Sequence, residues 1–152
     1  MSEATVGILV DYESPLASRV ASEVWSGLSR AALEAGFTKT TALWQSLREA
    51  RDGRSPEGSS AHIFVLGQDR PEAIDAIAAM DAAPAPHLYG VIVAVPVEQS
   101  PLAGSLLYQG VGRLTQSGVK AGMVEPALLH PVSTECERYA RHLFGRLSKV
   151  VW

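Results

Sequence analysis

Short apolar runs of β-favouring residues alternate with helical periods along most of this chain, and that alternation limits the folds it can adopt. The run TVGILV at 5–10 precedes the stretch 16–32, where apolar residues recur every four positions. The same succession returns at 62–80. Because the short runs are almost wholly apolar, they are typical of strands covered on both faces. Strands of this kind, alternating with helices, predict a parallel sheet between two helical layers.

The ends of these stretches carry boundary signals. Ser14 and Pro15 are a typical helix start, and Gly36 is a typical helix stop. The expected strands are 5–10, 37–44, 62–67, 88–97 and 119–124, and the expected helical stretches are 16–32, 70–80, 104–116 and 133–149. We therefore expect a single domain over residues 1–152. Its predicted fold is a flavodoxin-like three-layer α/β sandwich, with a five-stranded parallel sheet of order 2-1-3-4-5.

Helical spacing predicts which side of each helix faces the core. The predicted inward residues are Leu16, Val20, Val24, Leu28 and Ala32 in the first helix, Ile74, Ile77 and Ala78 in the second, and Cys136, Tyr139, Ala140, Leu143 and Leu147 in the last.

The composition excludes several classes of function. The formal net charge is −3 with no long basic run, which argues against a general nucleic-acid binder. The single cysteine, Cys136, allows no internal disulfide, and the four histidines share no metal-ligand spacing. No apolar run approaches the roughly 20 residues of a membrane span, and the N-terminus lacks a signal-peptide pattern. We expect a cytoplasmic protein that binds neither membranes nor metal ions.

Ligands of doubly wound sheets bind beyond the carboxyl ends of the strands, which directs attention to the strand-to-helix corners. At the first corner, DYESPLASR at 11–19, the helix N-terminus, the hydroxyls of Ser14 and Ser18 and the guanidinium of Arg19 could bind an anion. Asp11 and Glu13 bring two negative charges to the same corner. The alternative is that Ser14 only caps the helix.

Two further corners carry polar side chains. In GQDRPEA at 67–73, Gln68 and Asp69 can hydrogen-bond a planar ring, although Asp69 is equally well explained as a helix cap. The segment VPVEQSPLAGS at 95–105 is longer than a connection needs, and it offers three polar residues to a ligand. These are Glu98, Gln99 and Ser100. None of the three corners presents a nucleophile–base pair, so we predict a small-molecule site without a catalytic acid or base.

The stretch ILVDYESPLASR resembles the phosphate loop G-S-P-R-x-x-S-R of the NADPH-dependent FMN reductase family, which is flavodoxin-like. The likeness includes the pairs Ser14-Pro15 and Ser18-Arg19, while Glu13 stands where the family has glycine. The later segments GVIVAVPV and GSLLYQGVGRLTQSGVKAGMVEPALLHP are similar to the family's fourth strand, fourth helix and fifth strand. The resemblance implies that Ser14, Ser18 and Arg19 bind the phosphate of FMN, that NADPH is the co-substrate, and that the protein forms homo-oligomers.

Two other functions stay open. The stretches VGILVDYES and VPVEQSPLAGSLL are also similar to the small aminoimidazole ribonucleotide carboxylase family, which implies an enzyme acting on a phosphorylated ribonucleotide. That family carries an S-A-H-R segment, whereas S-A-H at 60–62 lacks the arginine and stands in a different place, at the start of an expected strand. The third hypothesis is a non-catalytic interaction module that keeps the fold but has a degenerate ligand site.

Overall fold

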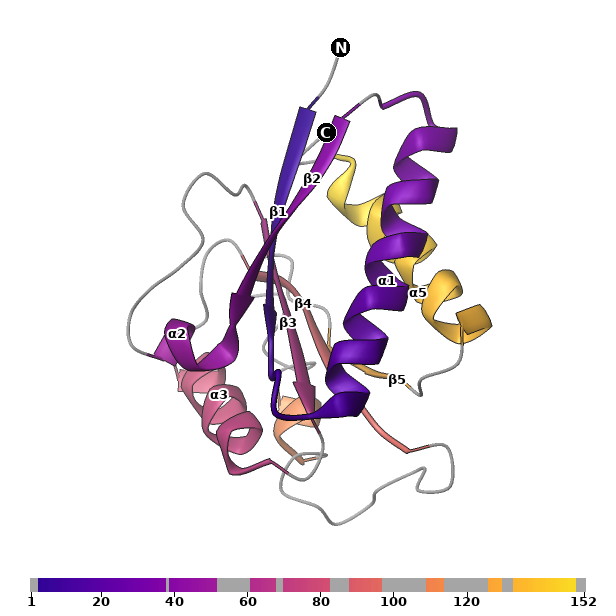
Figure 1. The fold of residues 1–152 in the computed structure, drawn as a ribbon. Helices are drawn as coiled ribbons and strands as arrows, with labels where there is room; N and C mark the ends of the chain where they lie inside the picture. The colour runs from indigo at the N-terminus through magenta and orange to yellow at the C-terminus, as the bar shows by residue number, and fades with distance from the viewer. Residues whose placement is uncertain are drawn as a thin grey trace.

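The computed structural model describes residues 3–37, 39–51, 61–67, 70–82, 88–96, 109–113, 126–129 and 133–149. Strands and helices alternate along the chain as expected (Figure 1). In chain order they are β1 (Glu3–Val10), α1 (Pro15–Glu34), β2 (Lys39–Ser46), α2 (Leu47–Arg51), β3 (Ala61–Gly67), α3 (Pro71–Ala82), β4 (Leu88–Ala94), β5 (Pro126–Leu129) and α5 (Ser133–Leu147). Residues 109–113 are also helical, and the rest of the helix expected over 104–116 lies outside the described residues.

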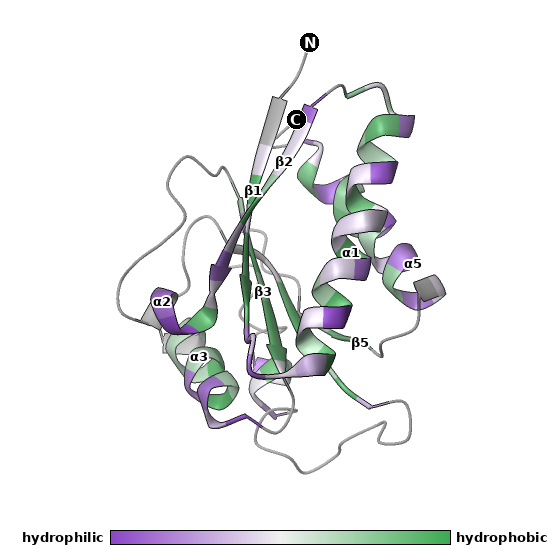
Figure 2. Cartoon of the chain, in the orientation of Figure 1, coloured by the Kyte–Doolittle hydropathy of each residue, from purple (hydrophilic) through white to green (hydrophobic). Residues whose placement is uncertain are grey.

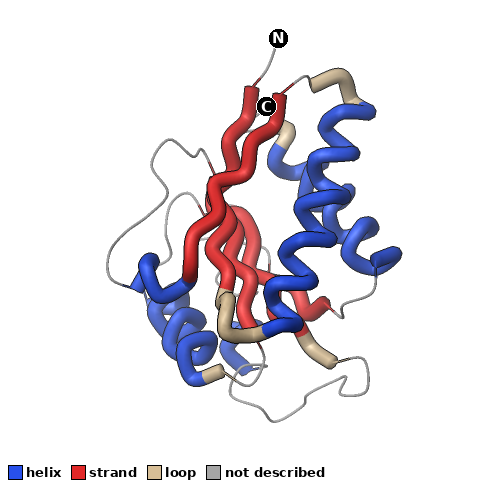
Figure 3. Tube along the Cα trace, in the orientation of Figure 1, coloured by secondary structure: helices blue, strands red, loops and turns tan. Residues whose placement is uncertain are grey.

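The strands form one parallel sheet in the order β2-β1-β3-β4-β5, which confirms the predicted flavodoxin-like topology. Figure 3 shows the strands running side by side between the helices. β1 pairs with β2 along its whole length, ending with Val10 opposite Ser46, and it pairs with β3 on its other side. The carboxyl ends of β1, β2 and β3 therefore meet at one edge of the sheet, where the strand order reverses.

Helices cover both faces of the sheet, with α1 and α5 on one face and α2 and α3 on the other (Figure 1). Along β3, Ile63 and Val65 belong to the core under α1 and α5, whereas Leu66 belongs to the core under α2 and α3. This alternation is what a strand buried on both sides requires. Figure 2 shows the same distribution, with hydrophobic residues on the central strands and on the helix sides that face them.

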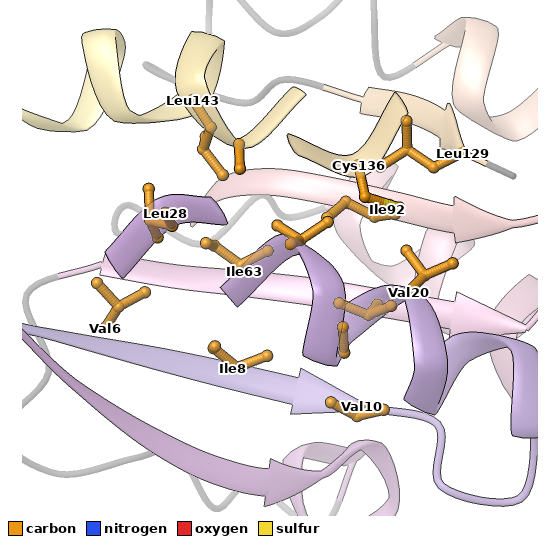
Figure 4. Packing of buried hydrophobic residues seen from close by; sticks show 14 of the residues in the cluster. Val6, Ile8, Val10, Val20, Leu28, Ile63, Ile92, Leu129, Cys136 and Leu143 are labelled. Atoms are coloured by element: carbon orange, nitrogen blue, oxygen red, sulfur yellow. The ribbon is translucent and has the colours of Figure 1, made fainter. Parts of the chain in front are cut away.

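The larger core lies between the sheet and the α1–α5 layer (Figure 4). The predicted inward side of α1 is confirmed, because four of its residues are buried and Leu16 is partly buried. The inward side of α5 is also confirmed, with Tyr139 partly buried against the core. The fully buried residues of α5 are Cys136, Ala140, Leu143 and Leu147.

α1 and α5 pack against each other closely at Gly27. A Cβ atom at this position would lie 2.8 Å from the Cβ of Ala140, closer than side-chain carbons come in real structures. At the solvent side of the same contact, Arg30 donates a hydrogen bond of 2.9 Å to Glu137. The absence of a side chain at Gly27 thus allows the two helices to share one layer.

The predicted inward side of α3 is partly wrong. Ile77 is buried as expected, but Ile74 and Ala78 are exposed. The remaining buried residues of this helix are Ala73, Ala76 and Met80. Alanine occurs on every side of α3, so its apolar pattern does not fix how the helix is rotated about its axis.

The segment 119–124, expected as the fifth strand, lies outside the described residues. The fifth strand of the sheet is instead Pro126–Leu129, which pairs with Val91–Ala94 of β4. Proline is tolerated there because it is the first residue of an edge strand. Among the helices of the described ranges, none is both long and apolar enough to cross a membrane.

Candidate functional site

The first corner is a tight connection between β1 and α1. The Asp11 N–H donates to the carbonyl of Val65 in β3 at 3.0 Å, which prolongs the sheet by one residue. The Ser14 N–H then donates to the Asp11 carbonyl at 3.0 Å. The Ser14 side chain accepts a hydrogen bond of 3.2 Å from the Ala17 N–H, so Ser14 is the N-cap of α1, followed by Pro15 in the first turn.

Gly67, at the end of β3, leaves the space that the Ser14 side chain occupies. A Cβ atom on Gly67 would lie 2.5 Å from both the Cβ and the Oγ of Ser14. Ser14 is buried, with 8% of its surface exposed. Its hydroxyl is therefore enclosed between the end of β3 and the first turn of α1, where it serves the helix cap.

Arg70, which immediately precedes α3, lies among three carboxylates. Its Nε is 3.3 Å from Asp11 Oδ2, and one of its terminal nitrogens is 3.2 Å from Glu72 Oε2. The same terminal nitrogen pairs with Glu13. Partial burial acts to lower the pKa of Arg70, but the charges of Asp11, Glu72 and Glu13 outweigh it and raise that pKa. Arg70 is thus a fixed positive charge at the centre of the corner.

Arg48 adds a second guanidinium from α2. Its terminal nitrogen lies 2.8 Å from Glu13 Oε1, while Glu13 Oε2 faces Arg70. We call Asp11, Glu13, Arg48, Arg70 and Glu72 the corner cluster. Its three carboxylates and two guanidinium groups, counted among the described side chains alone, give the cluster a formal charge of −1.

A cavity of about 200 Å³ opens beside the corner cluster, at the carboxyl ends of β1 and β2. Tyr12 lines it with a side chain that is half exposed (51%). Partial burial, followed by the charge of Glu49, raises the pKa of the Tyr12 hydroxyl, which keeps the ring neutral at physiological pH. The described residues that line it are Val10, Asp11, Tyr12, Glu13, Ser46, Leu47, Arg48 and Glu72.

The predicted phosphate-binding residues lie at the N-cap and in the first turns of α1 rather than in this cavity. Ser18 is partly buried, and its N–H donates to the Ser14 carbonyl at 3.1 Å. The Arg19 side chain is 64% exposed and pairs along the helix with Glu23, at 3.7 Å. None of Ser14, Ser18 and Arg19 lines the cavity. The other predicted contacts, Gln68, Asp69, Glu98, Gln99 and Ser100, lie outside the described residues and stay predictions.

Arg48 and Arg70, the two arginines of this corner, were not among the site residues predicted from the sequence. Arg48 follows the end of β2 by two residues, and Arg70 follows the end of β3 by three. Since β2 and β3 both flank β1, these positions converge on the segment that follows β1. Basic residues just after the two strands next to β1, opposite the acidic pair Asp11 and Glu13, were the signal that could have identified the cluster.

Fold and site together define a flavodoxin-like α/β protein with a charged cavity at the carboxyl edge of its sheet. The chain resembles the solved structure of NAD(P)H:quinone oxidoreductase from Methanothermobacter marburgensis, with 14% sequence identity and a TM-score of 0.52. The match covers 96% of this chain and 100% of that one. At this identity the likeness shows the fold. Comparisons with protein-family models and with curated proteins found no match.

A phosphate group, which the sequence resemblance places at the first corner, does not fit the corner as it is arranged. The Ser14 hydroxyl is enclosed and engaged in the helix cap. A phosphate dianion would also meet the carboxylates of Asp11, Glu13 and Glu72, whose combined charge already exceeds that of the two guanidinium groups. The roles of Ser14, Ser18 and Arg19 in phosphate binding therefore stay predictions, and the charge arrangement argues against them.

Proposed function

We propose that this chain is a flavin-reductase-like protein that binds its flavin at the carboxyl edge of the sheet. The observation that carries the proposal is the cavity beside the ends of β1 and β2. Ligands of doubly wound sheets bind at this edge, next to the reversal in strand order. The resemblance of ILVDYESPLASR to FMN reductases, and the shared fold with a protein named as a quinone oxidoreductase, support the same class of chemistry.

Tyr12 is the cavity residue best suited to contact a planar ring. It combines a half-exposed aromatic face with a hydroxyl that stays protonated, so it can stack without adding charge. Leu47, buried at the start of α2, supplies an apolar wall, and Ser46 supplies a hydroxyl. We assign the ring contact to Tyr12 and the adjoining contacts to Ser46 and Leu47.

The other parts of the proposal rest on the sequence resemblance. A flavin supplies its own redox chemistry, and the protein supplies binding and orientation, so the proposal requires no acid or base from the chain. NADPH as co-substrate and assembly into homo-oligomers follow from the resemblance to FMN reductases. Residues of the second and third corners, namely Gln68, Asp69, Glu98, Gln99 and Ser100, are proposed as further flavin contacts.

The proposal is tested by titrating riboflavin and FMN separately with the purified protein and following the quenching of flavin fluorescence. We expect saturable binding of at least one flavin. Ser46→Phe, which places a ring in the cavity, should abolish it. Thr41→Phe is the matched control, because Thr41 is an exposed residue of the same strand outside the cavity lining. Failure of both flavins to bind the wild-type protein would refute the proposal and favour the interaction module.

The carboxylase-like alternative gains no support from the described residues. Its S-A-H-R segment is matched only in part, by S-A-H at 60–62, which lacks the arginine. Ala61 and His62 begin β3, whereas the cavity lies at the carboxyl ends of the strands. Because the strands are parallel, Ala61 and His62 lie at the amino ends of the strands and the cavity lies at their carboxyl ends.

A further inference from the structure

The positive charges at the first corner are already committed to carboxylates of the chain. Arg48 faces Glu13, and Arg70 faces Asp11, Glu13 and Glu72. An anionic ligand group would therefore have to compete with carboxylates already in place. The electrostatic free energy that this competition costs is greatest for a ligand group with two negative charges.

Glu13 is the carboxylate that occupies the place of a ligand anion. Its two oxygens face two arginines from different elements, Arg48 in α2 and Arg70 before α3. The side chain is 53% exposed, so it could turn away into water. Asp11 has no such freedom, because it is buried beneath Arg70 with 5% of its surface exposed. Even a displaced Glu13 would leave Asp11 and Glu72 beside the incoming anion.

Two backbone N–H groups at the start of α1 are also engaged. The Ser14 N–H bonds the Asp11 carbonyl and the Ala17 N–H bonds the Ser14 hydroxyl, while Pro15 has no N–H to offer. A phosphate at a helix N-terminus depends on such groups pointing at it. Hydroxyl groups of a ligand, in contrast, need acceptors when they donate hydrogen bonds. Carboxylate oxygens are such acceptors, and each can accept more than one hydrogen bond.

We infer that this corner selects a flavin without a phosphate, of which riboflavin is the simplest, and that Glu13 is the residue that discriminates against FMN. The inference rests on the proposed function and specifies its ligand. The hydroxylated side chain of riboflavin donates to the Glu13 carboxylate and adds no charge to the corner cluster. The phosphate of FMN adds negative charge where the carboxylates already outnumber the guanidinium groups.

The test compares the dissociation constants of riboflavin and FMN for wild-type protein and for Glu13→Gln at one ionic strength. We expect the wild-type protein to bind riboflavin about tenfold more tightly than FMN. Glu13→Gln should largely remove this difference, because it deletes one negative charge and releases Arg48. Glu13→Ser, which deletes the same charge, provides a second measurement. Added salt should also narrow the wild-type difference.

Glu34→Gln is the matched control. Glu34 is as exposed as Glu13, at 54%, and is likewise paired with an arginine, but it lies at the far end of α1. The Glu34→Gln substitution should leave the ratio of the riboflavin and FMN dissociation constants unchanged. Equal or tighter binding of FMN by the wild-type protein would overturn this inference and leave the proposed function standing. A ratio unaltered by both Glu13 substitutions would overturn the role of Glu13, and failure of both flavins to bind would overturn function and inference together.

Discussion

Gly67 is the position at which a single added methyl group tests the contact between the sheet and the first corner. A Cβ atom there would lie 2.5 Å from the Cβ and Oγ of Ser14 and 3.0 Å from the Cγ of Arg70. Gly67 does not have a positive φ, so alanine would meet an obstacle in packing rather than a strained backbone. The long arginine side chain can move aside, whereas Ser14 is held by its hydrogen bond with Ala17.

Two costs combine in Gly67→Ala. Forcing a methyl group into a well-packed site costs about 1–3 kcal/mol. Moving the Ser14 hydroxyl away from the Ala17 N–H removes a helix cap worth about 1 kcal/mol. We therefore expect the free energy of unfolding to fall by about 2–4 kcal/mol, a large share of the stability of a domain of this size.

The assay is urea-induced unfolding followed by circular dichroism for wild-type protein, Gly67→Ala, Ser14→Gly and the double variant. Ser14→Gly removes the two Ser14 atoms that the new methyl group would meet, and glycine as an N-cap costs only a few tenths of a kcal/mol. In that background Gly67→Ala should cost less than about 1 kcal/mol. A Gly67→Ala protein as stable as the wild type, or an equal cost in both backgrounds, would refute the reasoning.

Two further predictions concern α5. Gly145 has open space around its Cα, so Gly145→Ala should raise the free energy of unfolding by about 0.5–1 kcal/mol in the same urea assay, and a decrease would contradict the geometry. Arg141 lowers the pKa of Glu34, first through a hydrogen bond and then through its charge. This pair therefore stabilises the fold at pH values above 4.5, the ordinary pKa of a glutamate, and the stabilisation is lost as the pH falls through the lowered pKa. In Arg141→Met an NMR titration should find the Glu34 pKa higher than in the wild type, and an unchanged pKa would show that the pair does not form in solution.

The topology of the sheet could be predicted because local signals and burial agree in β1 and α1. TVGILV is almost wholly apolar because both sides of β1 are covered, and Ser14 and Pro15 begin α1 where the cap signals placed it. The rotation of α3 could not be predicted, since its alanines make several sides equally apolar. The position of the fifth strand was missed because Pro126–Leu129 is only four residues long and begins with proline.

The candidate site was predicted only in part. Its location at the first corner follows from the order of strands and helices, and the acidic pair Asp11 and Glu13 is visible in the sequence. The partners of Glu13 are not, because Arg48 is 35 residues away and Arg70 is 57 residues away. Only the folded sheet brings these residues together, so pairing of charges, unlike a helix cap, cannot be recognised from neighbouring residues.

The shared layer of α1 and α5 has a consequence for the order in which the protein can fold during its synthesis. Arg30 and Glu137, which face each other across that layer, are 107 residues apart in sequence. On a ribosome, β1 to β4 and α1 emerge well before α5, so the apolar side of α1 has to wait for residues such as Leu143 to cover it. The opposite face receives α2 and α3 as each follows its strand. We therefore expect the face under α2 and α3 to close first during translation, with the larger core under α1 and α5 exposed to chaperones until α5 has left the ribosome.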